Sequence, residues 1–219
     1  MSHVLISGGT RGIGSAVANK FLCNGYKVTC LYSSNDVAAN NFRESCMDFS
    51  DCLNVKKCDV SSPEEVKKCV EESKGLFGSV DIVVSNAGIS FVGLADTFTF
   101  DDYRRIMDTN FGGFFNLTNS VIPDMVHNKS GVIIAISSMW GQVGASCEAL
   151  YSASKGAIDA YVKSLAKELG PSGIRVNAVS PGVVKTDMLN CYSEEDLAEL
   201  ADETPLGKVG SPEEIANMV

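Results

Sequence analysis

The sequence has little histidine, little basic charge and no long apolar run, and each shortage excludes a class of protein. Only two histidines accompany eight cysteines, and no two cysteines form a Cys-x-x-Cys pair, so we expect no metal site. Lysine and arginine total 18 against 27 aspartate and glutamate residues, which argues against nucleic acid as a partner. No apolar run approaches the roughly 18 residues that span a bilayer, and no signal peptide is recognisable, so we expect no membrane segment.

The cysteines point to a reducing compartment. Several lie inside apolar periodic segments, where a free thiol behaves as a small hydrophobic group. We therefore expect a cytoplasmic protein without structural disulfides. The eight are Cys23, Cys30, Cys46, Cys52, Cys58, Cys69, Cys147 and Cys191. With 219 residues and 45% hydrophobic content, the chain should form one domain over residues 1–219 with a substantial core.

A glycine-rich turn follows the first apolar run of the chain. His3 to Ser7 is typical of a buried strand, and an apolar helical pattern begins soon after Gly14. Between them the sequence reads Gly8-Gly9-Thr10-Arg11-Gly12-Ile13-Gly14. Strand, glycine turn and helix in this order predict a pyrophosphate site, because glycines admit the phosphates and the helix N-terminus presents free N–H groups. A turn that binds no ligand is the alternative for this motif alone.

The end of the second predicted strand, Lys27 to Tyr32, indicates which dinucleotide is bound. Such sites often place a carboxylate there to bind the adenosine ribose hydroxyls. Here the sequence continues Ser33-Ser34, and the first carboxylate is Asp36. Arg11 in the glycine turn and the Ser33 hydroxyl instead favour a 2′-phosphate, so the predicted cofactor is NADP(H).

Strand and helix patterns alternate along the remaining chain. Parallel strands joined by helices of this length need a sheet that is covered on both faces, so we predict a doubly wound, Rossmann-type α/β fold. A weak point interrupts the helical pattern of residues 99–129 at Asn110 to Gly113. The further strands are expected at residues 55–58, 80–85, 131–137 and 174–180, and the further helices at 36–42, 62–77, 99–129 and 151–170, with a polar connection at 43–53.

The stretch Tyr151-Ser152-Ala153-Ser154-Lys155 opens the last long helical pattern. Residues four apart share a helix face, so the phenol and the ammonium should point the same way. A nearby cation favours the phenolate and should lower the tyrosine pKa, as a proton-transfer tyrosine requires. Taken alone, the pair is also compatible with an exposed helix start. The nucleotide site, the serine and the asparagine elsewhere in the chain make an enzyme the better interpretation.

In their order, these motifs resemble the short-chain dehydrogenases/reductases from the first strand to the last residue. Ser7, where threonine is usual, and Ser85, where a second asparagine is usual, are small departures. The matching elements are the Gly8–Gly14 turn, Asp59, Asn86-Ala87-Gly88, Asn110, Ser138, Tyr151-x-x-x-Lys155, Pro181-Gly182 and Thr186.

The resemblance implies a role for each matching position. Tyr151 would donate a proton to the substrate oxygen, and Ser138 would hydrogen-bond the same oxygen. Lys155 would lower the pKa of Tyr151 and hold the nicotinamide ribose. Asn110 would hold a water molecule of the proton relay. The implied cofactor-binding residues are Gly8, Thr10, Arg11, Gly12, Ile13, Gly14, Ser33, Asp59, Val60, Asn86, Ala87, Gly88, Tyr151, Lys155, Pro181, Gly182, Val184 and Thr186.

The ketone substrate has two candidate carriers. In length and pattern the chain resembles 3-oxoacyl-acyl-carrier-protein reductases, but their two basic docking positions are here Lys129 and Ser172. The stretch from Ser138 to Glu148 instead resembles the elongation factor P 5-aminopentanone reductases, whose substrate ends in an ammonium that Glu148 could pair. A non-catalytic NADP(H) sensor is a more remote alternative. Candidate substrate residues are Met139, Trp140, Gln142, Cys147 and Glu148.

The last predicted helix begins at Ser211-Pro212-Glu213-Glu214 and stops at Val219 without a cap. Members of this family usually continue with the rest of that helix and a seventh strand. We therefore expect a shortened C-terminal part, with the sixth strand left as a sheet edge. Since the continuation often contributes to the family's oligomer, a homo-oligomer is expected only for a chain that is complete in nature.

Overall fold

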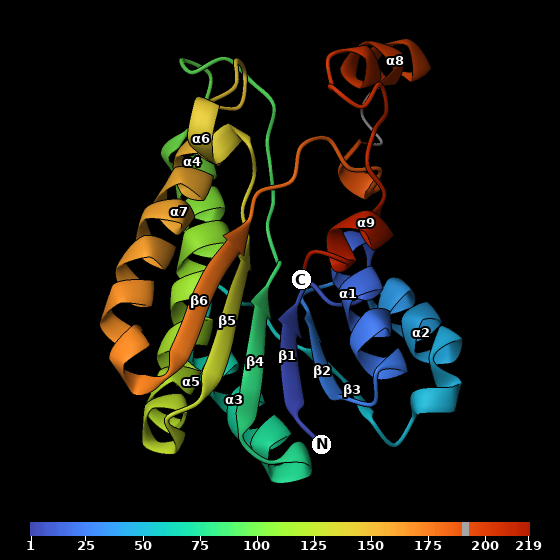
Figure 1. Cartoon of the computed structure of the whole chain (residues 1–219). Coiled ribbons are helices and arrows are strands. Elements are labelled where there is room, and N and C mark those ends of the chain that lie inside the picture. The colour runs from blue at the N-terminus through green and yellow to red at the C-terminus, as the bar shows by residue number, and fades with distance from the viewer. Residues whose placement is uncertain (190–192) are drawn as a thin grey trace.

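A computed structural model describes residues 1–189 and 193–219, so Cys191 lies outside the described residues. Six parallel strands form one sheet, as the alternating pattern predicted, and their order is β3-β2-β1-β4-β5-β6 (Figure 1). The strands are β1 (His3–Ser7), β2 (Lys27–Tyr32), β3 (Leu53–Lys57), β4 (Val80–Ser85), β5 (Gly131–Ile136) and β6 (Ile174–Val179).

Helices connect successive strands and cover both faces of the sheet. The α-helices are α1 (Gly12–Cys23), α2 (Asp36–Ser45), α3 (Pro63–Phe77), α4 (Phe100–Met107), α5 (Gly113–Asn128), α6 (Trp140–Val143), α7 (Ala149–Leu169), α8 (Glu194–Asp202) and α9 (Pro212–Ala216). A π-helical turn, η2 (Asp108–Gly112), joins α4 to α5. Short 3-10 turns are η1 (Met47–Phe49), η3 (Gly170–Ser172) and η4 (Asp187–Leu189).

The core consists of two apolar layers, one on each face of the sheet. Because side chains alternate along a strand, Leu5 of β1 packs with α3, α5 and α7, whereas Val4 and Ile6 pack with α1 and α2. Figure 1 shows the two groups of helices on opposite sides of the strands, with α9 beside α1.

Two predicted boundaries were wrong around β3. The connection expected at residues 43–53 is partly helical, since α2 continues to Ser45 and η1 follows. Phe42 and Cys46 are buried in the α1–α2 layer, so packing extends the helix beyond its polar pattern. Strand β3 begins at Leu53, opposite Val28, and ends one residue before Cys58.

The order in which strands are added to the sheet reverses at β1: β2 and β3 are added on one side of it, and β4, β5 and β6 on the other. β2 lies on one side of β1 and β4 on the other, and a crevice opens at the carboxyl ends of strands at such a point.

The seven cysteines in the described ranges are free thiols, and these ranges contain no cluster suited to a metal ion. None of the described helices is both long and apolar enough to cross a membrane.

Candidate active site

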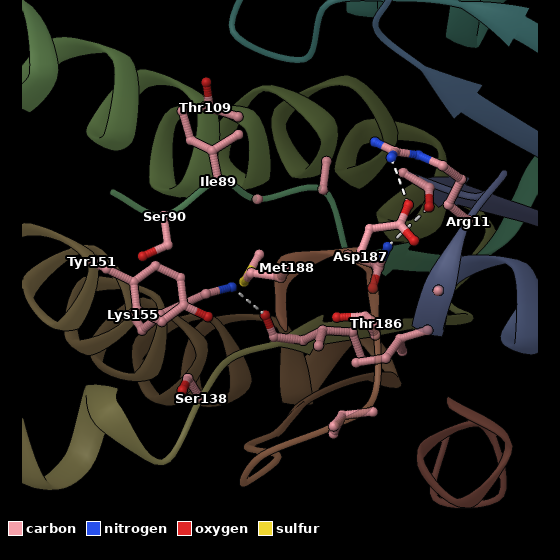
Figure 2. Close-up of a pocket in the computed structure, with 18 of the residues that line it drawn as sticks. Arg11, Ile89, Ser90, Thr109, Ser138, Tyr151, Lys155, Thr186, Asp187 and Met188 are labelled. Atoms are coloured by element: carbon pink, nitrogen blue, oxygen red, sulfur yellow. Dashed lines mark hydrogen bonds and ion pairs between the residues drawn. The ribbon is translucent and has the colours of Figure 1, made fainter. Parts of the chain in front are cut away.

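A cavity of about 1070 Å³ lies at the carboxyl ends of the strands. It extends from the glycine turn after β1 to the first turns of α7, and Figure 2 shows Arg11 and Asp187 on one side and Tyr151, Lys155 and Ser138 on the other. This volume is at the top of the range of about 300–1000 Å³ that is usual for ligand pockets, so it suits a large ligand. It therefore has room for an extended ligand beside a smaller one.

The glycine turn leaves the N-terminus of α1 open to an anion. Gly8 and Gly12 have φ values of +62° and +51°, which a residue with a side chain rarely adopts. Arg11 stands at the N-cap of α1 without a capping hydrogen bond from its side chain, and the first turn contains no acidic residue. The free N–H groups and the helix dipole thus fit a pyrophosphate group.

Gly14 has a different function from the other two glycines. An added Cβ there would lie 2.1 Å from the carbonyl oxygen of Gly8, and Gly14 does not line the cavity. The glycine therefore permits the close contact between α1 and the turn rather than contact with a ligand. Of the predicted cofactor residues, those that line the cavity are Gly8, Thr10, Arg11, Gly12, Ile13, Ser33, Asp59, Val60, Asn86, Ala87, Gly88, Tyr151, Lys155, Pro181, Gly182, Val184 and Thr186.

Asn86 and Ser7 hold the glycine turn against the end of β4. The Asn86 side-chain amide donates to the carbonyl oxygens of Ser7 and Gly8, both at 3.1 Å. In return the Ser7 hydroxyl accepts hydrogen bonds from the backbone N–H groups of Asn86 and Ala87 at 3.0 Å. The Asn86 side chain is thus engaged with the turn itself, and Ser7 supplies the hydroxyl that the more usual threonine would provide.

The predicted weak point of the helix is the π-turn η2, which places Asn110 inside the protein. Asn110 is 1% exposed, and its Oδ1 accepts the Ile89 N–H at 2.8 Å. Its Nδ2 donates to the Ile89 carbonyl and to the Ser154 hydroxyl at 3.0 and 2.9 Å. π-turns inside helices are frequent at functional sites. Asn110 does not line the cavity; it joins the loop after β4 to α7.

Tyr151, Ser138 and Lys155 come together at the other end of the cavity. Tyr151 and Lys155 lie in the first two turns of α7 and are 9% and 3% exposed. The pKa of Tyr151 is raised, first by burial and further by the negative charge of Glu148, while a hydrogen bond with Ser138 acts to lower it. This direction is opposite to the one predicted from the nearby lysine.

The position of the Lys155 ammonium explains the difference. Its Nζ lies 5.6 Å from the centre of the Tyr151 ring and donates to the Ile136 carbonyl oxygen at 2.7 Å. Burial lowers the pKa of Lys155 to about 8, with Asp159 acting in the opposite direction. The two side chains do share a helix face, but the largest influence on the pKa of Tyr151 is burial of the phenol, which raises it.

At the glycine-turn end, the charged side chains face solvent. Arg11 Nη1 lies 2.7 Å from Asp187 Oδ2, and the two side chains are 52% and 61% exposed. Asp36, the first carboxylate after β2, accepts hydrogen bonds from Lys57 and Tyr32, which lower its pKa. The cavity wall formed by Tyr32, Ser33 and Ser34 thus carries no carboxylate.

The loop before α7 places a carboxylate close to Tyr151. Glu148 Oε2 accepts the Ser90 hydroxyl at 2.8 Å, and both residues line the cavity with Met139 and Trp140. Two predicted substrate residues, Gln142 and Cys147, do not line it. Gln142 lies on the short helix α6 and donates to Ser180, and the carbonyl of Cys147 accepts the Gly93 N–H.

Ser7, Ser90 and Asp187 are among the residues of the site that were not predicted from the sequence. Ser7 was seen only as a departure from threonine, although its position just before the glycines indicates that it could support them. Ser90 directly follows the loop held by Asn110, and Asp187 directly follows Thr186, so adjacency to a predicted residue was the available signal. Their partners lie far away in the sequence, which hid their contacts.

Comparisons with known proteins give the family. Residues 2–197 match the family model described as short chain dehydrogenase, and the chain belongs to this family of oxidoreductases. The relative YmfI of Bacillus subtilis, described as an uncharacterized oxidoreductase, is 38% identical over 97% of this chain and 87% of its own length. An acetoacetyl-CoA reductase of Shinella zoogloeoides is 37% identical over 100% of this chain and 90% of its own length. A 3-oxoacyl-[acyl-carrier-protein] reductase of Chlamydia pneumoniae is 34% identical over 98% of this chain and 86% of its own length.

Solved structures agree with the fold. The crystal structure of gox2181 superposes with a TM-score of 0.93 at 30% identity and covers 99% of this chain and 86% of that one. The structure of ElxO with NADP bound has a TM-score of 0.92 at 29% identity, over 99% of this chain and 89% of that one. The predicted enzyme class, fold and type of cofactor, a nicotinamide dinucleotide, are confirmed by family membership.

Proposed function

We propose that the protein reduces a ketone to a secondary alcohol with NADPH. The observation that carries the proposal is the arrangement of the cavity, with the open N-terminus of α1 at one end and Tyr151, Ser138 and Lys155 at the other. When bound, the nicotinamide cofactor supplies a hydride. The residues of this chain would then need to hold the carbonyl oxygen and deliver one proton to it.

Tyr151 is suited to deliver the proton. A phenol is protonated at neutral pH, which is the form that a proton donor to the carbonyl oxygen requires, and Tyr151 lines the cavity together with Ser138. Ser138, whose hydroxyl acts to lower the pKa of the phenol, would hold the same oxygen as negative charge develops on it. Lys155 would bind the cofactor's ribose next to Gly88, where an added Cβ would lie 3.5 Å from the ammonium.

The preference for NADPH over NADH rests on charge at the glycine-turn end. Arg11 lines the cavity there, while Tyr32, Ser33 and Ser34 offer hydroxyls and no carboxylate. A guanidinium recognises a phosphate through two N–H groups, whereas a carboxylate would repel it. ElxO, a structural neighbour of similar fold, binds NADP.

For the substrate, we propose the 5-aminopentanone modification carried on a lysine of elongation factor P. The support is Glu148, which lies three residues before the reacting tyrosine and whose carboxylate is fixed by Ser90 at 2.8 Å. The negative charge of Glu148 raises the pKa of Tyr151, so the two groups are close enough to interact electrically. A substrate ammonium bound to Glu148 would therefore place its ketone near the phenol.

Glu148→Gln tests this substrate. The amide keeps the shape of the side chain and its ability to accept from Ser90, but it removes the charge. The Michaelis constant for ketones that carry an amine should rise by the equivalent of roughly 1–3 kcal/mol, with neutral ketones unaffected. The measurement is steady-state NADPH oxidation with matched amine-bearing and neutral ketones, and with modified elongation factor P.

A matched control is Glu168→Gln, which removes a carboxylate from the last turn of α7, the helix that follows Glu148. It should change neither Michaelis constant. An equal loss for charged and neutral ketones in Glu148→Gln would show that Glu148 only shapes the loop, and would contradict the elongation factor P proposal while leaving ketone reduction standing.

A second candidate is reduction of a 3-oxoacyl group on acyl carrier protein or coenzyme A. It is favoured by two arginines of α4, Arg104 and Arg105, which line the cavity and lie 5.1 and 5.0 Å from the ring centres of Phe100 and Phe91. Guanidinium groups held at the cavity rim would suit a phosphate-bearing carrier. Reduction of acetoacetyl carriers with unchanged rates in Glu148→Gln would favour this candidate.

A further inference from the structure

We propose that Asp187 is a specificity-determining residue for the cofactor, because it competes with a 2′-phosphate for Arg11. The inference rests on the proposed preference for NADPH. It assigns a function to the carboxylate that faces the phosphate-reading side chain, a position that the sequence pattern did not single out. Figure 2 shows the Asp187 carboxylate directed at the Arg11 guanidinium, with the 2.7 Å ion pair between them.

Asp187 approaches the glycine turn from the segment that follows β6. It is the first residue of η4, and the preceding Thr186 lies against Gly12, where an added Cβ would be 3.2 Å from the threonine methyl group. The chain before it is anchored by hydrogen bonds between Lys185 N and Gly210 O and between Gly210 N and Val183 O, both 2.9 Å long. The carboxylate is therefore positioned by the fold next to Arg11.

The Arg11–Asp187 pair is exposed, and exposure makes it exchangeable. Both side chains are more than half exposed, and surface ion pairs of this kind contribute about 0.2–1 kcal/mol. A phosphate group carries more charge than one carboxylate and offers three oxygens to the guanidinium. Binding of a 2′-phosphate to Arg11 would thus displace Asp187 or place two anions around one cation. In both cases the carboxylate opposes the phosphate.

A ligand without the 2′-phosphate meets no such competition. Arg11 then stays paired with Asp187, and the carboxylate costs the ligand nothing. Asp187 accordingly weakens binding of NADPH without weakening that of NADH, so it limits a selectivity that Arg11 creates.

The test is Asp187→Asn, measured by calorimetric titration with adenosine 2′,5′-bisphosphate and with adenosine 5′-monophosphate. These compounds bind without any turnover, so the readout is separate from activity. We expect the variant to bind the bisphosphate up to about fivefold more tightly, the upper end of the range for an exposed ion pair, and the monophosphate as tightly as the wild type does. The gain should shrink at high salt, because exposed charges are screened.

Two further variants make the result specific. In an Arg11→Ala background, Asp187→Asn should lose most of its effect, since the competition acts through Arg11. Asp124→Asn, which removes a carboxylate paired with Lys74 at 2.6 Å outside the cavity, should leave both affinities unchanged.

Weaker bisphosphate binding in Asp187→Asn would overturn the proposal, because it would mean that Asp187 orients Arg11 for the phosphate. Equal changes for both nucleotides would also overturn it. If the wild type bound the two nucleotides equally well, the proposed NADPH preference itself would fall. That outcome is distinguishable from failure of the Asp187 assignment alone.

Discussion

The residues at the two ends of the cavity are held in place by different kinds of contact. At the α7 end, Tyr151, Lys155 and Asn110 are at least nine-tenths buried, and Asn110 and Lys155 bond to backbone groups. At the glycine-turn end, Arg11 and Asp187 are more than half exposed and bond to each other. The buried end depends on desolvation and fixed hydrogen bonds, whereas the exposed end depends on charges that solvent screens.

Because of this difference, substitutions at the buried end should cost more stability than substitutions at the exposed end. A buried polar group that loses its partner costs about 1–3 kcal/mol, so the α7 end should tolerate few substitutions. An exposed ion pair is worth at most about 1 kcal/mol, so the cofactor end can be altered without loss of the fold. We expect mutations at the first end to act on chemistry and stability, and those at the second on affinity alone.

The largest expected effect is that of Tyr151→Phe at the buried end. Removal of the hydroxyl should lower turnover by about 100-fold or more, the usual contribution of a general acid, while cofactor affinity stays nearly unchanged because the ring still packs. NADPH oxidation with an activated ketone measures the first quantity, and calorimetric titration the second. Tyr103→Phe, an exposed tyrosine of α4, is the control. More than about a tenth of wild-type activity in Tyr151→Phe would refute the assignment.

A second test uses pH to measure what burial of Lys155 costs. Its pKa is lowered to about 8 in the folded chain, against about 10.4 for lysine in an unfolded chain. Between these values the unfolded chain holds the extra proton, so the free energy of unfolding should rise with pH there. Below about pH 8 both states are protonated, and the full penalty of the buried charge is present.

Lys155→Met removes this pH dependence. Its stability relative to the wild type should therefore fall by about 3 kcal/mol as the pH rises from about 7 to about 10.5, whatever the difference at the starting pH. Urea unfolding at several pH values provides the measurement. Lys163→Met, an exposed lysine of the same helix, should show no such trend. A constant difference between Lys155→Met and wild type would mean that the ammonium is well solvated.

The smallest of these effects is expected at the exposed end. Arg11→Ala should weaken NADPH binding by about 1.5 kcal/mol, the lower end of the range for a hydrogen bond to a charged group, because Arg11 must first leave Asp187. NADH binding should barely change. Titration of both cofactors into Arg11→Ala and into the control Lys67→Ala, which alters an exposed lysine of α3, checks this. Equal losses of affinity for both cofactors would show that Arg11 does not read the 2′-phosphate.

The same contrast explains which parts of the protein the sequence could predict. The strands and the glycine turn are buried, and burial leaves a regular apolar pattern that can be read without coordinates. Asn110 was predicted through a break in that pattern, two residues inside the actual start of η2. The break in the helical pattern is visible in the local sequence, whereas the hydrogen bonds between Asn110 and Ile89 are not.

Long-range polar contacts left no such signal. The Arg11–Asp187 pair joins residues 176 positions apart, and the Ser90–Glu148 hydrogen bond joins residues 58 positions apart. No periodicity connects such residues. The direction of the Tyr151 pKa was mispredicted for a related reason, since helical spacing gives the shared face of the tyrosine and the lysine but not the degree to which each is buried.

The π-turn between α4 and α5 also bears on how this chain can change by insertion and deletion. A π-turn holds one residue more than a regular helical turn, so α4, η2 and α5 form one rod with an added residue. Because the turn absorbs the extra residue, α5 continues in phase with α4, and Phe114 and Leu117 remain fully buried. Deleting one residue from Asp108–Gly112 would therefore restore a regular turn and keep the buried face of the 16-residue helix α5 toward the core. It would remove the bulge that directs Asn110 toward Ile89 and Ser154, so the asparagine's contacts could be lost by a deletion that leaves the fold intact.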